Sequence, residues 1–452
     1  MISDEALVQS LSGIVGSEHV LAGEAARSFA IDGKAPRAVV SPASVEEVSA
    51  VMLLAHAEGL KVIPRGNGTK MGLGALPEQV HLIIVLTRMN RLVDHEPADM
   101  TATFEAGMTL KEAQAILGRN GQCLALDPPH SDTATIGGIL ATNSSGPWRL
   151  RYGTSRDLVL AVQVVHADGK VTKGGAKVVK NVAGYDMSKL YIGSLGTLAI
   201  IVAVSFRLYP KTAFEGTYLA PFASIDSVWE VAAGILDSPI VASAVEILNP
   251  EASRHAAGLS GLPWGENLYS LAVAVGSVRR EAVDAQLGRV KQICSQAGIS
   301  EGHLLIGQPH DQFWQMTRDP RWDSGPRALL KASVLPNQLV QGVKLAEEIA
   351  GREGLGVEII SDAGSGIIRT YLFGKSSSTE EFTRNVAEVV HRLRTFALES
   401  EGSLVVLEAP TEVKNKLDIW GPVGKTLTLM QSLKAQFDPG RILNPGRFVG
   451  GI

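Results

Sequence analysis

The chain has 452 residues, a formal net charge of −4 and two cysteines, Cys123 and Cys294. This length suffices for two or three domains with hydrophobic cores, and the small net charge gives no electrostatic reason to expect nucleic acid or an anionic membrane as a partner. Two cysteines are too few for a disulfide framework, a cysteine-ligated iron–sulfur cluster or a cysteine-ligated zinc site.

The first residues, 1–5, lack the basic and apolar regions of a signal peptide. The longest mostly apolar stretch, 198–206, is too short to span a bilayer. We therefore expect a cytoplasmic protein without a transmembrane segment, whose ligands are small molecules.

The first elements along the chain predict a small βαβ unit. Residues 37–40 and 61–63 have the composition of short strands, and the apolar positions of 45–58 recur at helical spacing. Ser44 and Glu47 form a capping-box pattern that is typical of a helix start.

Further strands and a second helix are predicted up to residue 173. An apolar run at 81–86 and a strand at 101–104 precede a helix whose capping-box pattern is Thr109 and Glu112. Residues 159–173 predict a β-hairpin around an Asp-Gly turn.

After residue 211 the pattern changes to strands that alternate with longer amphipathic helices. The helices are predicted at 224–236, 279–295, 336–350 and 378–398, which indicates a second α+β domain. The chain ends in a helical pattern and a turn-dense tail at 437–448. Residues 421–426 resemble part of a Walker A loop, but the first required glycine falls on Ile419 and no strand leads in, so we interpret them as a helix start.

A glycine-rich loop, residues 64–74, follows the predicted strand at 61–63 directly. Glycines let backbone N–H groups converge on a diphosphate without interference from a Cβ atom. The spacing of Gly66, Gly68 and Gly72 is not that of a Rossmann fingerprint. A connector between two strands is the commoner meaning of such a segment.

A second loop, residues 127–146, combines a proline-fixed entry, hydroxyl side chains and the paired glycines Gly137 and Gly138. Thr135, Thr142 and Asn143 could donate to diphosphate or flavin oxygens, and the paired glycines admit the edge of an aromatic ring. The two loops together indicate a flavin dinucleotide far more specifically than either loop alone.

The order of these motifs resembles the FAD domain of the vanillyl-alcohol oxidase / p-cresol methylhydroxylase (PCMH) superfamily. The resemblance rests on residues 65–69, 136–138, 141–143, 151–153, 157 and 193–197. More narrowly, residues 127–130, 145–147, 180–186 and 313–319 resemble the smaller FAD-binding subunit of bacterial glycolate oxidase, and 437–439 and 444–447 fit the tail of the same family.

The resemblance implies an α+β fold with a two-subdomain PCMH-type FAD-binding domain. An α+β (ferredoxin-like) cap domain would follow, and a C-terminal helix and tail would return to the flavin. The expected domains are an N-terminal helical extension at 1–35, the FAD-binding domain at 36–212, the cap or substrate domain at 213–410, and the C-terminal helix and tail at 411–452.

The resemblance also implies which residues bind FAD. They are Pro64, Arg65, Gly66, Asn67, Gly68, Thr69, Pro128, Thr135, Gly137, Gly138, Thr142, Asn143, Gly146, Tyr152, Gly196, Ile200, Ile201 and Asn444. Thr69 lies where relatives that tether their flavin place a histidine, so the expected cofactor is non-covalent FAD.

Catalytic members of the family use a histidine-rich metal motif and a Glu-His element further on. No histidine stands at the ligand positions around 359–366 or near 401–404, so no metal is expected. The catalytic residues stay unknown. Arg318, at the spacing of the family's carboxylate-binding arginine, and His130, in the cofactor loop, are the candidates.

Each candidate has a plainer alternative. Arg318 could form a salt bridge with Asp319, and His130 could hydrogen-bond the backbone or stack on a ring. Lys180 could reach the flavin edge, but a charged helix entry explains it as well.

Three hypotheses of function follow. In the first, the chain is the FAD-binding subunit of a glycolate oxidase or dehydrogenase complex that oxidises 2-hydroxy acids (glycolate to glyoxylate), with a catalytic flavoprotein subunit and an iron–sulfur subunit as partners. The complex could hold it peripherally at the inner membrane. In the second, it is a freestanding FAD-dependent D-2-hydroxy-acid dehydrogenase of the D-lactate type. In the third, it is a non-catalytic FAD-holding scaffold.

Overall fold

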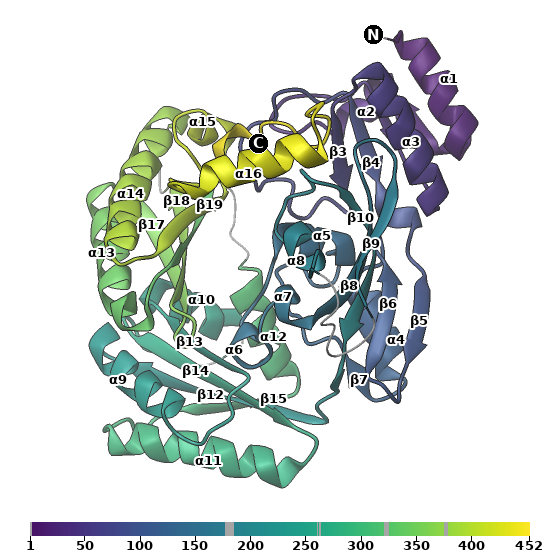
Figure 1. The fold of residues 1–452 in the computed structure, drawn as a ribbon. Helices are drawn as coiled ribbons and strands as arrows, with labels where there is room; N and C mark the ends of the chain where they lie inside the picture. The colour runs from purple at the N-terminus through teal and green to yellow at the C-terminus, as the bar shows by residue number, and fades with distance from the viewer. Residues whose placement is uncertain (1, 177–184, 260, 262–263, 321–324, 375–377) are drawn as a thin grey trace. The chain divides into compact units, whose positions relative to one another are not determined.

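The computed structural model describes residues 2–176, 185–259, 261, 264–320, 325–374 and 378–452 (Figure 1). The chain divides into two compact units. Unit 1 comprises Met1–Ser145, Thr154–Pro210 and Pro422–Ile452, and unit 2 comprises Gly146–Gly153 and Lys211–Gly421. No helix in the described ranges is both long and apolar enough to cross a bilayer.

The first sheet of unit 1 has four strands in the order β1-β2-β4-β3. They are β1 (Val20–Ala22), β2 (Ala38–Val40), β3 (Val62–Arg65) and β4 (Leu82–Val85). Strands β2 and β3 both run parallel to β4, so β4 lies between the two strands of the predicted βαβ unit. All four residues of β4 are buried, as expected of an apolar run in a parallel strand.

The second sheet of unit 1 is antiparallel and has the order β5-β6-β10-β8-β9. Its strands are β5 (Leu92–Glu96), β6 (Thr101–Glu105), β8 (Val159–Val165), β9 (Val171–Gly175) and β10 (Ile200–Arg207), and β7 (Gln122–Cys123) pairs with β11 (Tyr209–Pro210) in a separate ribbon. The predicted hairpin is confirmed as β8 and β9. Thr103 and Ser205 share a hydrogen bond of 2.8 Å between Oγ atoms of directly opposite residues, which fixes the register of β6 against β10.

Unit 1 contains the helices α1 (Asp4–Val15), α2 (Gly23–Arg27), α3 (Val45–Glu58), α4 (Leu110–Gly118), α5 (Ile136–Thr142), α7 (Ser155–Leu158), α8 (Ser188–Tyr191) and α16 (Thr426–Phe437), with short 3₁₀ turns at Ser17–His19, Leu86–Arg88 and Val449–Gly451. Side chains cap the first turn of α1, α3, α4, α5 and α7, whereas α2, α8 and α16 begin without a side-chain cap. The capping box of Thr109 and Glu112 is confirmed at α4. At α3 the Ser44 hydroxyl accepts from the Glu47 N–H, but the Glu47 carboxylate accepts from the N–H of Ala43 rather than of Ser44.

Unit 2 is built on one antiparallel sheet of eight strands in the order β15-β12-β14-β13-β17-β18-β16-β19. The strands are β12 (Phe214–Phe222), β13 (Ala244–Leu248), β14 (Tyr269–Ser277), β15 (His303–Ile306), β16 (Arg327–Ser333), β17 (Leu355–Asp362), β18 (Ile367–Gly374) and β19 (Ser403–Glu408). The β-α-β-β-α-β pattern runs from β16 to β19, and it occurs also from β12 to β15 with the helix α10 (Pro250–Leu259) inserted between β13 and β14. The two halves meet where β13 pairs with β17.

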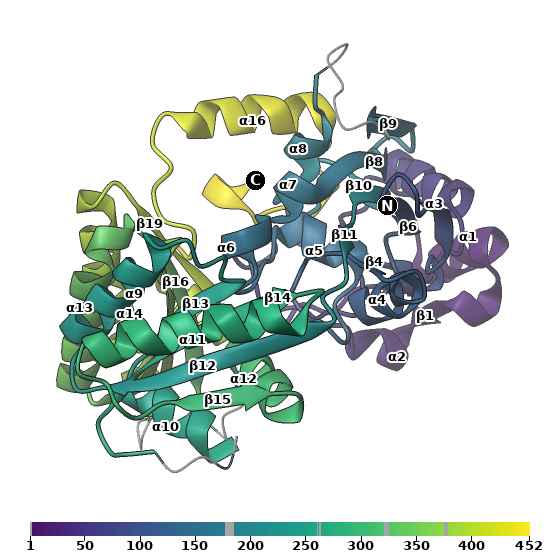
Figure 2. The ribbon, with the colours of Figure 1, turned by 90° about the horizontal axis from the view of Figure 1, so that it is seen from below.

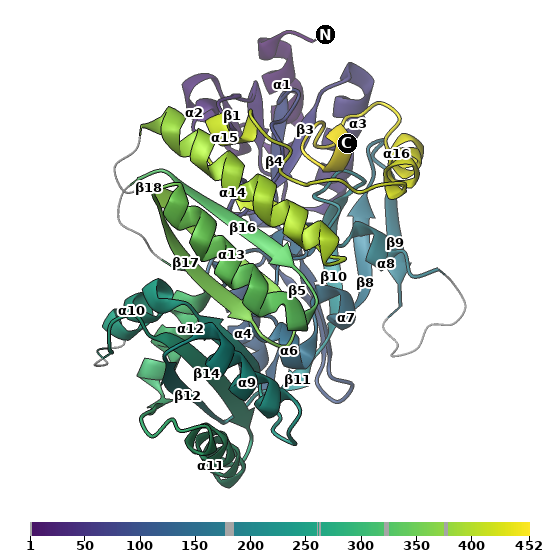
Figure 3. The ribbon, with the colours of Figure 1, turned by 90° about the vertical axis from the view of Figure 1, so that its left-hand side faces the viewer.

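The predicted amphipathic helices are present as α9 (Ile225–Leu236), α11 (Arg280–Gln296), α13 (Leu339–Arg352), preceded by a 3₁₀ turn at Pro336–Gln338, and α14 (Thr379–Glu399). Figure 2 shows α11 running along β12, and Figure 3 shows α13 and α14 side by side over β16 to β18. The remaining helices are α6 (Arg149–Tyr152), α10 (Pro250–Leu259), α12 (Gln308–Arg318) and α15 (Thr411–Lys414). Helices α10 and α12 pack on a core cluster that includes Leu248 and Ile360 of the sheet and Phe313 of α12.

Candidate functional site

The two glycine-rich loops of unit 1 are in direct contact. A Cβ atom added to Gly66 would lie 2.1 Å from Thr135 Oγ1, so only glycine permits this approach of the first loop to the second. The Asn67 side-chain amide donates to the Thr133 carbonyl at 2.8 Å. The loops are therefore brought together as one structure.

Beside these loops, unit 1 has a cleft whose open space, including the part that is open to solvent, amounts to about 720 Å³. The structure brings most of the residues predicted to bind FAD to this cleft, namely Pro64, Arg65, Gly66, Asn67, Gly68, Thr69, Thr135, Gly137, Gly138, Thr142, Gly196, Ile201 and Asn444.

The other residues predicted to bind FAD do not line the cleft. Ile200 and Ile201 are neighbours in β10, and successive strand residues point to opposite faces, so only Ile201 reaches the cleft. Asn143 ends α5 in the left-handed conformation, and Pro128 is buried in the entry to the second loop. Gly146 and Tyr152 belong to unit 2.

The cleft also contains residues that the sequence motifs did not single out. Leu86, Ala106 and Ala199 line it. These residues lie apart from the glycine loops in the chain and carry no polar side chain, so no sequence signal marked them. Leu195 lines the cleft as well and belongs to the recognised motif at 193–197. Arg447 lines the cleft too, and the tail motif that contains it was recognised.

Two arginines give the cleft a positive character. Arg447 is buried, and this burial lowers its pKa to about 10, against the attraction of Asp32. Its guanidinium donates to the Met71 carbonyl at 2.6 Å and to the Leu73 carbonyl, which closes the first loop. The Arg65 guanidinium lies 4.7 Å from the centre of the Phe29 ring, and partial burial lowers its pKa.

These residues fit FAD. A diphosphate requires cations and backbone donors, which the arginines and the glycine loops supply. The buried Oδ1 atom of Asn444 has no hydrogen-bond partner among the described residues, so an acceptor is available at the cleft for a donor of the bound cofactor.

Unit 2 contains a second group of charged side chains, on one face of its sheet. Glu246 of β13 is directly opposite Asp362 of β17, and Lys331 of β16 is directly opposite Arg369 of β18. Arg369 and Glu246 form an ion pair with 2.8 Å between Nη2 and Oε1. Arg149 of α6 is also within electrostatic reach of Lys331 and Asp362. We call these five residues the charged cluster.

The charged cluster perturbs the titration of two of its members. Burial, together with the positive charges of Arg149 and Arg369, lowers the pKa of Lys331 to about 8. Burial raises the pKa of Asp362, against a hydrogen bond of 2.9 Å from the Ser365 N–H to its Oδ1. Its buried Oδ2 has no hydrogen-bond partner within the described part of the chain.

The two catalytic candidates lie in different units. Arg318 ends α12 in unit 2, and its Nε is buried without a hydrogen-bond partner in the ranges that the structure describes. His130 belongs to unit 1, is exposed and does not line the cleft. Its carbonyl accepts from the N–H groups of Thr133 and Ala134, at 2.9 and 2.7 Å. Lys180 lies outside the described residues.

No three His, Cys, Asp or Glu side chains of the described residues are arranged to hold a metal ion. Cys123 is half-buried and Cys294 is buried.

Comparison with family models gives two matches. Residues 36–175 match the family described as "FAD binding domain", and residues 211–405 and 420–448 match "FAD linked oxidases, C-terminal domain". Together the matches extend over most of the chain.

Comparison with known proteins gives relatives over nearly the full length. The chain is 26% identical to the glycolate oxidase subunit GlcD of Bacillus subtilis, over 91% of this chain and 88% of that protein. It is 28% identical to the D-lactate dehydrogenase of Archaeoglobus fulgidus, over 92% and 93%. Its fold is similar to that of p-cresol methylhydroxylase with substrate bound, with a TM-score of 0.76, 19% identity and coverage of 98% and 96%. The chain therefore belongs to the FAD-linked oxidases, with a PCMH-type FAD-binding fold, and is an FAD-dependent oxidoreductase.

Proposed function

We propose that the chain is the FAD-binding subunit of a glycolate oxidase or dehydrogenase complex and that it takes part in oxidising the CH–OH group of 2-hydroxy acids. Its partners are a catalytic flavoprotein subunit and an iron–sulfur subunit. The observation that carries the substrate class is the charged cluster of unit 2. It places the cations Arg149, Lys331 and Arg369 near Asp362, whose Oδ2 has no hydrogen-bond partner among the described residues.

The cations of the charged cluster suit a substrate carboxylate. Lys331 and Arg369 are like charges on directly opposite residues of adjacent strands. Arg369 is paired with Glu246, but its charge and that of Arg149 still lower the pKa of Lys331. A substrate carboxylate beside Lys331 would relieve this repulsion, and such charge-assisted hydrogen bonds are the strong ones. A 2-hydroxy acid carries its carboxylate on the carbon that bears the hydroxyl, so this contact also positions the reacting group.

If this chain oxidises the substrate itself, Asp362 is the base that the charged cluster offers. Its Oδ2 atom has no hydrogen-bond partner among the described residues, and its raised pKa makes it a stronger proton acceptor than an exposed aspartate. Oxidation of a CH–OH group requires removal of the hydroxyl proton and of a hydride. Within unit 2, Asp362 would accept the hydroxyl proton of a 2-hydroxy acid whose carboxylate Lys331 binds.

Membership of a complex is supported by the similarity to the GlcD subunit and by the cysteine content. An electron that leaves FAD needs a further carrier, and two cysteines in the whole chain cannot ligate an iron–sulfur cluster. The onward carrier is therefore assigned to another subunit. Non-covalent attachment of FAD and a cytoplasmic location, with contact to the inner membrane only through the complex, belong to the same proposal.

A second candidate is a freestanding D-2-hydroxy-acid dehydrogenase. It is supported by the similarity to D-lactate dehydrogenase and by the charged cluster, which would give this chain its own carboxylate contact and base. The arginine predicted to bind a carboxylate, Arg318, is in the same unit with an Nε that has no partner in the described ranges, and it is a further candidate for this contact.

Anaerobic reduction of the flavin separates the two candidates. The full chain is purified alone and after co-expression with the products of the neighbouring coding regions, and glycolate or D-lactate is added while the visible flavin band is recorded. Bleaching only in the co-purified assembly supports the complex. Bleaching of the chain alone contradicts it and supports the freestanding enzyme. An FAD-loaded chain that neither bleaches nor binds a partner contradicts both and leaves the non-catalytic scaffold.

A further inference from the structure

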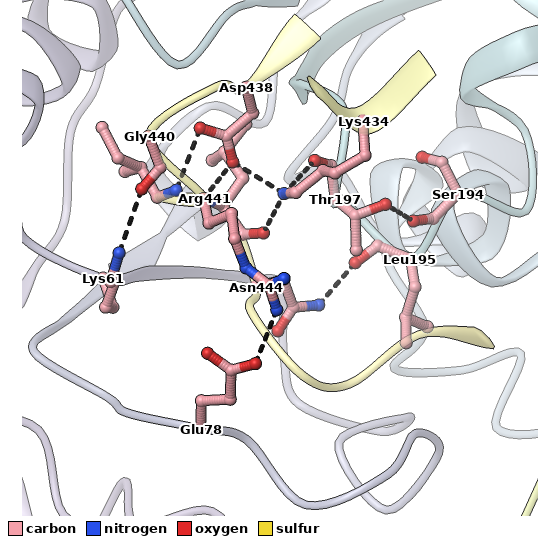
Figure 4. Close-up of polar contacts among 12 residues, drawn as sticks. Lys61, Glu78, Ser194, Leu195, Thr197, Lys434, Asp438, Gly440, Arg441 and Asn444 are labelled. Atoms are coloured by element: carbon pink, nitrogen blue, oxygen red, sulfur yellow. Dashed lines mark hydrogen bonds and ion pairs between the residues drawn. The ribbon is translucent and has the colours of Figure 1, made fainter. Parts of the chain in front are cut away.

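The C-terminal segment of unit 1 holds one turn of the FAD cleft by buried side chains (Figure 4). Three residues make the contacts: Lys434 near the end of α16, and Asp438 and Asn444 in the tail that follows. We call them the tail clasp. They contact the backbone of the turn Leu195–Thr197, which is more than two hundred residues earlier in the chain.

The ammonium group of Lys434 uses all three of its N–H donors. It donates to the Thr197 carbonyl at 2.8 Å, to the Leu443 carbonyl at 2.8 Å and to Asp438 Oδ2 at 2.6 Å. The side chains of Lys434 and Asp438 are 6% and 0% exposed. A buried ammonium with a carboxylate partner and no donor left over is a fully satisfied group, so its geometry is tightly defined.

Asp438 and Asn444 complete the tail clasp. The Asp438 carboxylate accepts hydrogen bonds from two backbone N–H groups of the tail. Its Oδ1 accepts from Ile442 at 2.9 Å and its Oδ2 from Leu443 at 2.7 Å, which fixes the conformation of the tail. The Asn444 side-chain amide donates to the Leu195 carbonyl at 2.5 Å. The Asn444 N–H donates to the Val62 carbonyl at 2.8 Å, which joins the tail to β3, the strand from which the first glycine loop emerges.

The turn that is held lies on the cleft. Leu195 and Gly196 both line it, and both have positive φ angles, of 54° and 69°. Leucine rarely adopts this left-handed conformation, so the turn needs contacts from outside to hold it. Lys434 and Asn444 bind the carbonyls on either side of Gly196. Glycine is required there because a Cβ atom would come 2.7 Å from Pro64 Cγ in the first loop.

We propose that Lys434, Asp438 and Asn444 are positioning residues for FAD, which fix the Leu195–Gly196 wall of the cleft against the first glycine loop and so set the affinity for FAD. Lys434 and Asp438 act through the backbone alone, whereas Asn444 also lines the cleft, where its Oδ1 is available to the cofactor. The proposal depends on FAD as cofactor and is independent of the substrate and of any partner subunit.

The test compares FAD affinity in variants of the full chain. Apoprotein of the wild type, Asn444→Ala and Lys434→Met is titrated with FAD, and the quenching of flavin fluorescence gives the dissociation constant. Lys434→Met leaves the buried Asp438 carboxylate without its cation and could fail to fold for that reason. The double variant K434M/D438N removes both charges together, so it replaces the single variant in the titration if the single variant does not fold. Arg441→Met is the matched control, because Arg441 joins the same tail to Glu78 through an exposed ion pair.

The tail clasp variants are expected to bind FAD about tenfold or more weakly than the wild type, which corresponds to the loss of one buried hydrogen bond. The dissociation constant of Arg441→Met is expected to stay within about twofold of the wild-type value. At saturating FAD, the visible circular dichroism of the bound flavin is expected to change in the tail clasp variants, which a general loss of stability would not cause. Lys434 and Asp438 do not line the cleft, so a dissociation constant and a spectrum like those of the wild type in Lys434→Met or in the double variant would overturn the proposal. So would an equal loss of affinity in Arg441→Met.

Discussion

Gly66 and Thr135, from the two glycine-rich loops, approach so closely that a single added methyl group at position 66 would overlap the threonine hydroxyl. Gly66→Ala must therefore push the loops apart or displace Thr135, whose hydroxyl caps α5 by accepting the Gly138 N–H. Overpacking of this kind costs about 1–3 kcal/mol, which corresponds to an FAD affinity lower by roughly 5- to 150-fold. The dissociation constant of FAD, measured by titration of the apoprotein, checks this.

Gly13→Ala is the control for this substitution. Gly13 lies in α1 of the same unit, and an added Cβ atom would meet no atom within 4 Å. Alanine favours a helix over glycine by up to about 1 kcal/mol, so this variant should bind FAD like the wild type and unfold at a slightly higher temperature. Normal FAD binding by Gly66→Ala would show that the contact of the two loops does not shape the cofactor site.

Lys331→Met should weaken the binding of a 2-hydroxy acid. If Lys331 donates to the substrate carboxylate, its loss removes a hydrogen bond to a charged group, worth about 1.5–3 kcal/mol. The expected result is a fall in kcat/KM of roughly 10- to 150-fold, mostly through KM. Steady-state kinetics with glycolate and D-lactate measures kcat/KM, on the chain alone or on the co-purified assembly, whichever oxidises the substrate. Lys344→Met is the matched control, because Lys344 forms an exposed ion pair with Asp226 in the same unit.

The activity should decline on the alkaline side of neutral pH. Lys331 is protonated below its lowered pKa of about 8 and neutral above it. A neutral lysine no longer attracts the carboxylate, so kcat/KM should fall as the pH rises through about 8. The Lys331→Met variant should lack this alkaline limb. An identical pH profile of wild type and variant would exclude Lys331 as the group that titrates.

The lowered pKa of Lys331 also affects the stability of the fold, and there a rise in pH is favourable. The folded chain gives up the Lys331 proton near pH 8, whereas in an unfolded chain the ordinary lysine pKa of 10.5 applies. Between these values the unfolded state binds more protons, so this group makes folding more favourable as the pH rises. Loss of activity above pH 8 is therefore expected without loss of fold, which circular dichroism at each pH would check.

Arg369→Met should destabilise unit 2 strongly. The Glu246 side chain that pairs with Arg369 has no exposed area, and removal of one partner of a buried ion pair typically costs about 3–5 kcal/mol. The double variant E246Q/R369M leaves no unpaired charge and should recover much of the loss. Urea unfolding gives the free energies. Equal stability of Arg369→Met and the wild type would show that this pair does not stabilise the fold.

Local features of the fold were predictable from the sequence, whereas the order of the strands was not. The capping box of Thr109 and Glu112 and the hairpin of β8 and β9 depend on residues a few positions apart, so the sequence pattern identifies them. The insertion of β4 between β2 and β3 depends on pairing between distant segments. The repetition of the β-α-β-β-α-β pattern in unit 2 was missed for the same reason.

In the candidate sites too, features that depend on neighbouring residues were predictable from the sequence, whereas features that depend on distant segments were not. The first glycine loop and Thr135 were predicted, because a cofactor loop needs a recognisable run of small and hydroxyl residues. The charged cluster was not predicted. Glu246, Lys331, Asp362 and Arg369 come from four strands and become neighbours only through the register of the sheet. The hydrogen bond from Lys434 to the Thr197 carbonyl was not predictable either, because it depends on the return of the C-terminal tail to unit 1.

The most direct test of the account is the flavin content of the full chain purified alone. The visible spectrum is recorded after incubation with excess FAD and removal of unbound cofactor, and the protein is then precipitated with acid. The account predicts about one FAD per chain and, because Thr69 stands where tethering relatives place histidine, release of the flavin into the acid supernatant. A folded chain that remains colourless would contradict FAD binding by the two glycine loops, and flavin that stays in the acid pellet would contradict non-covalent attachment.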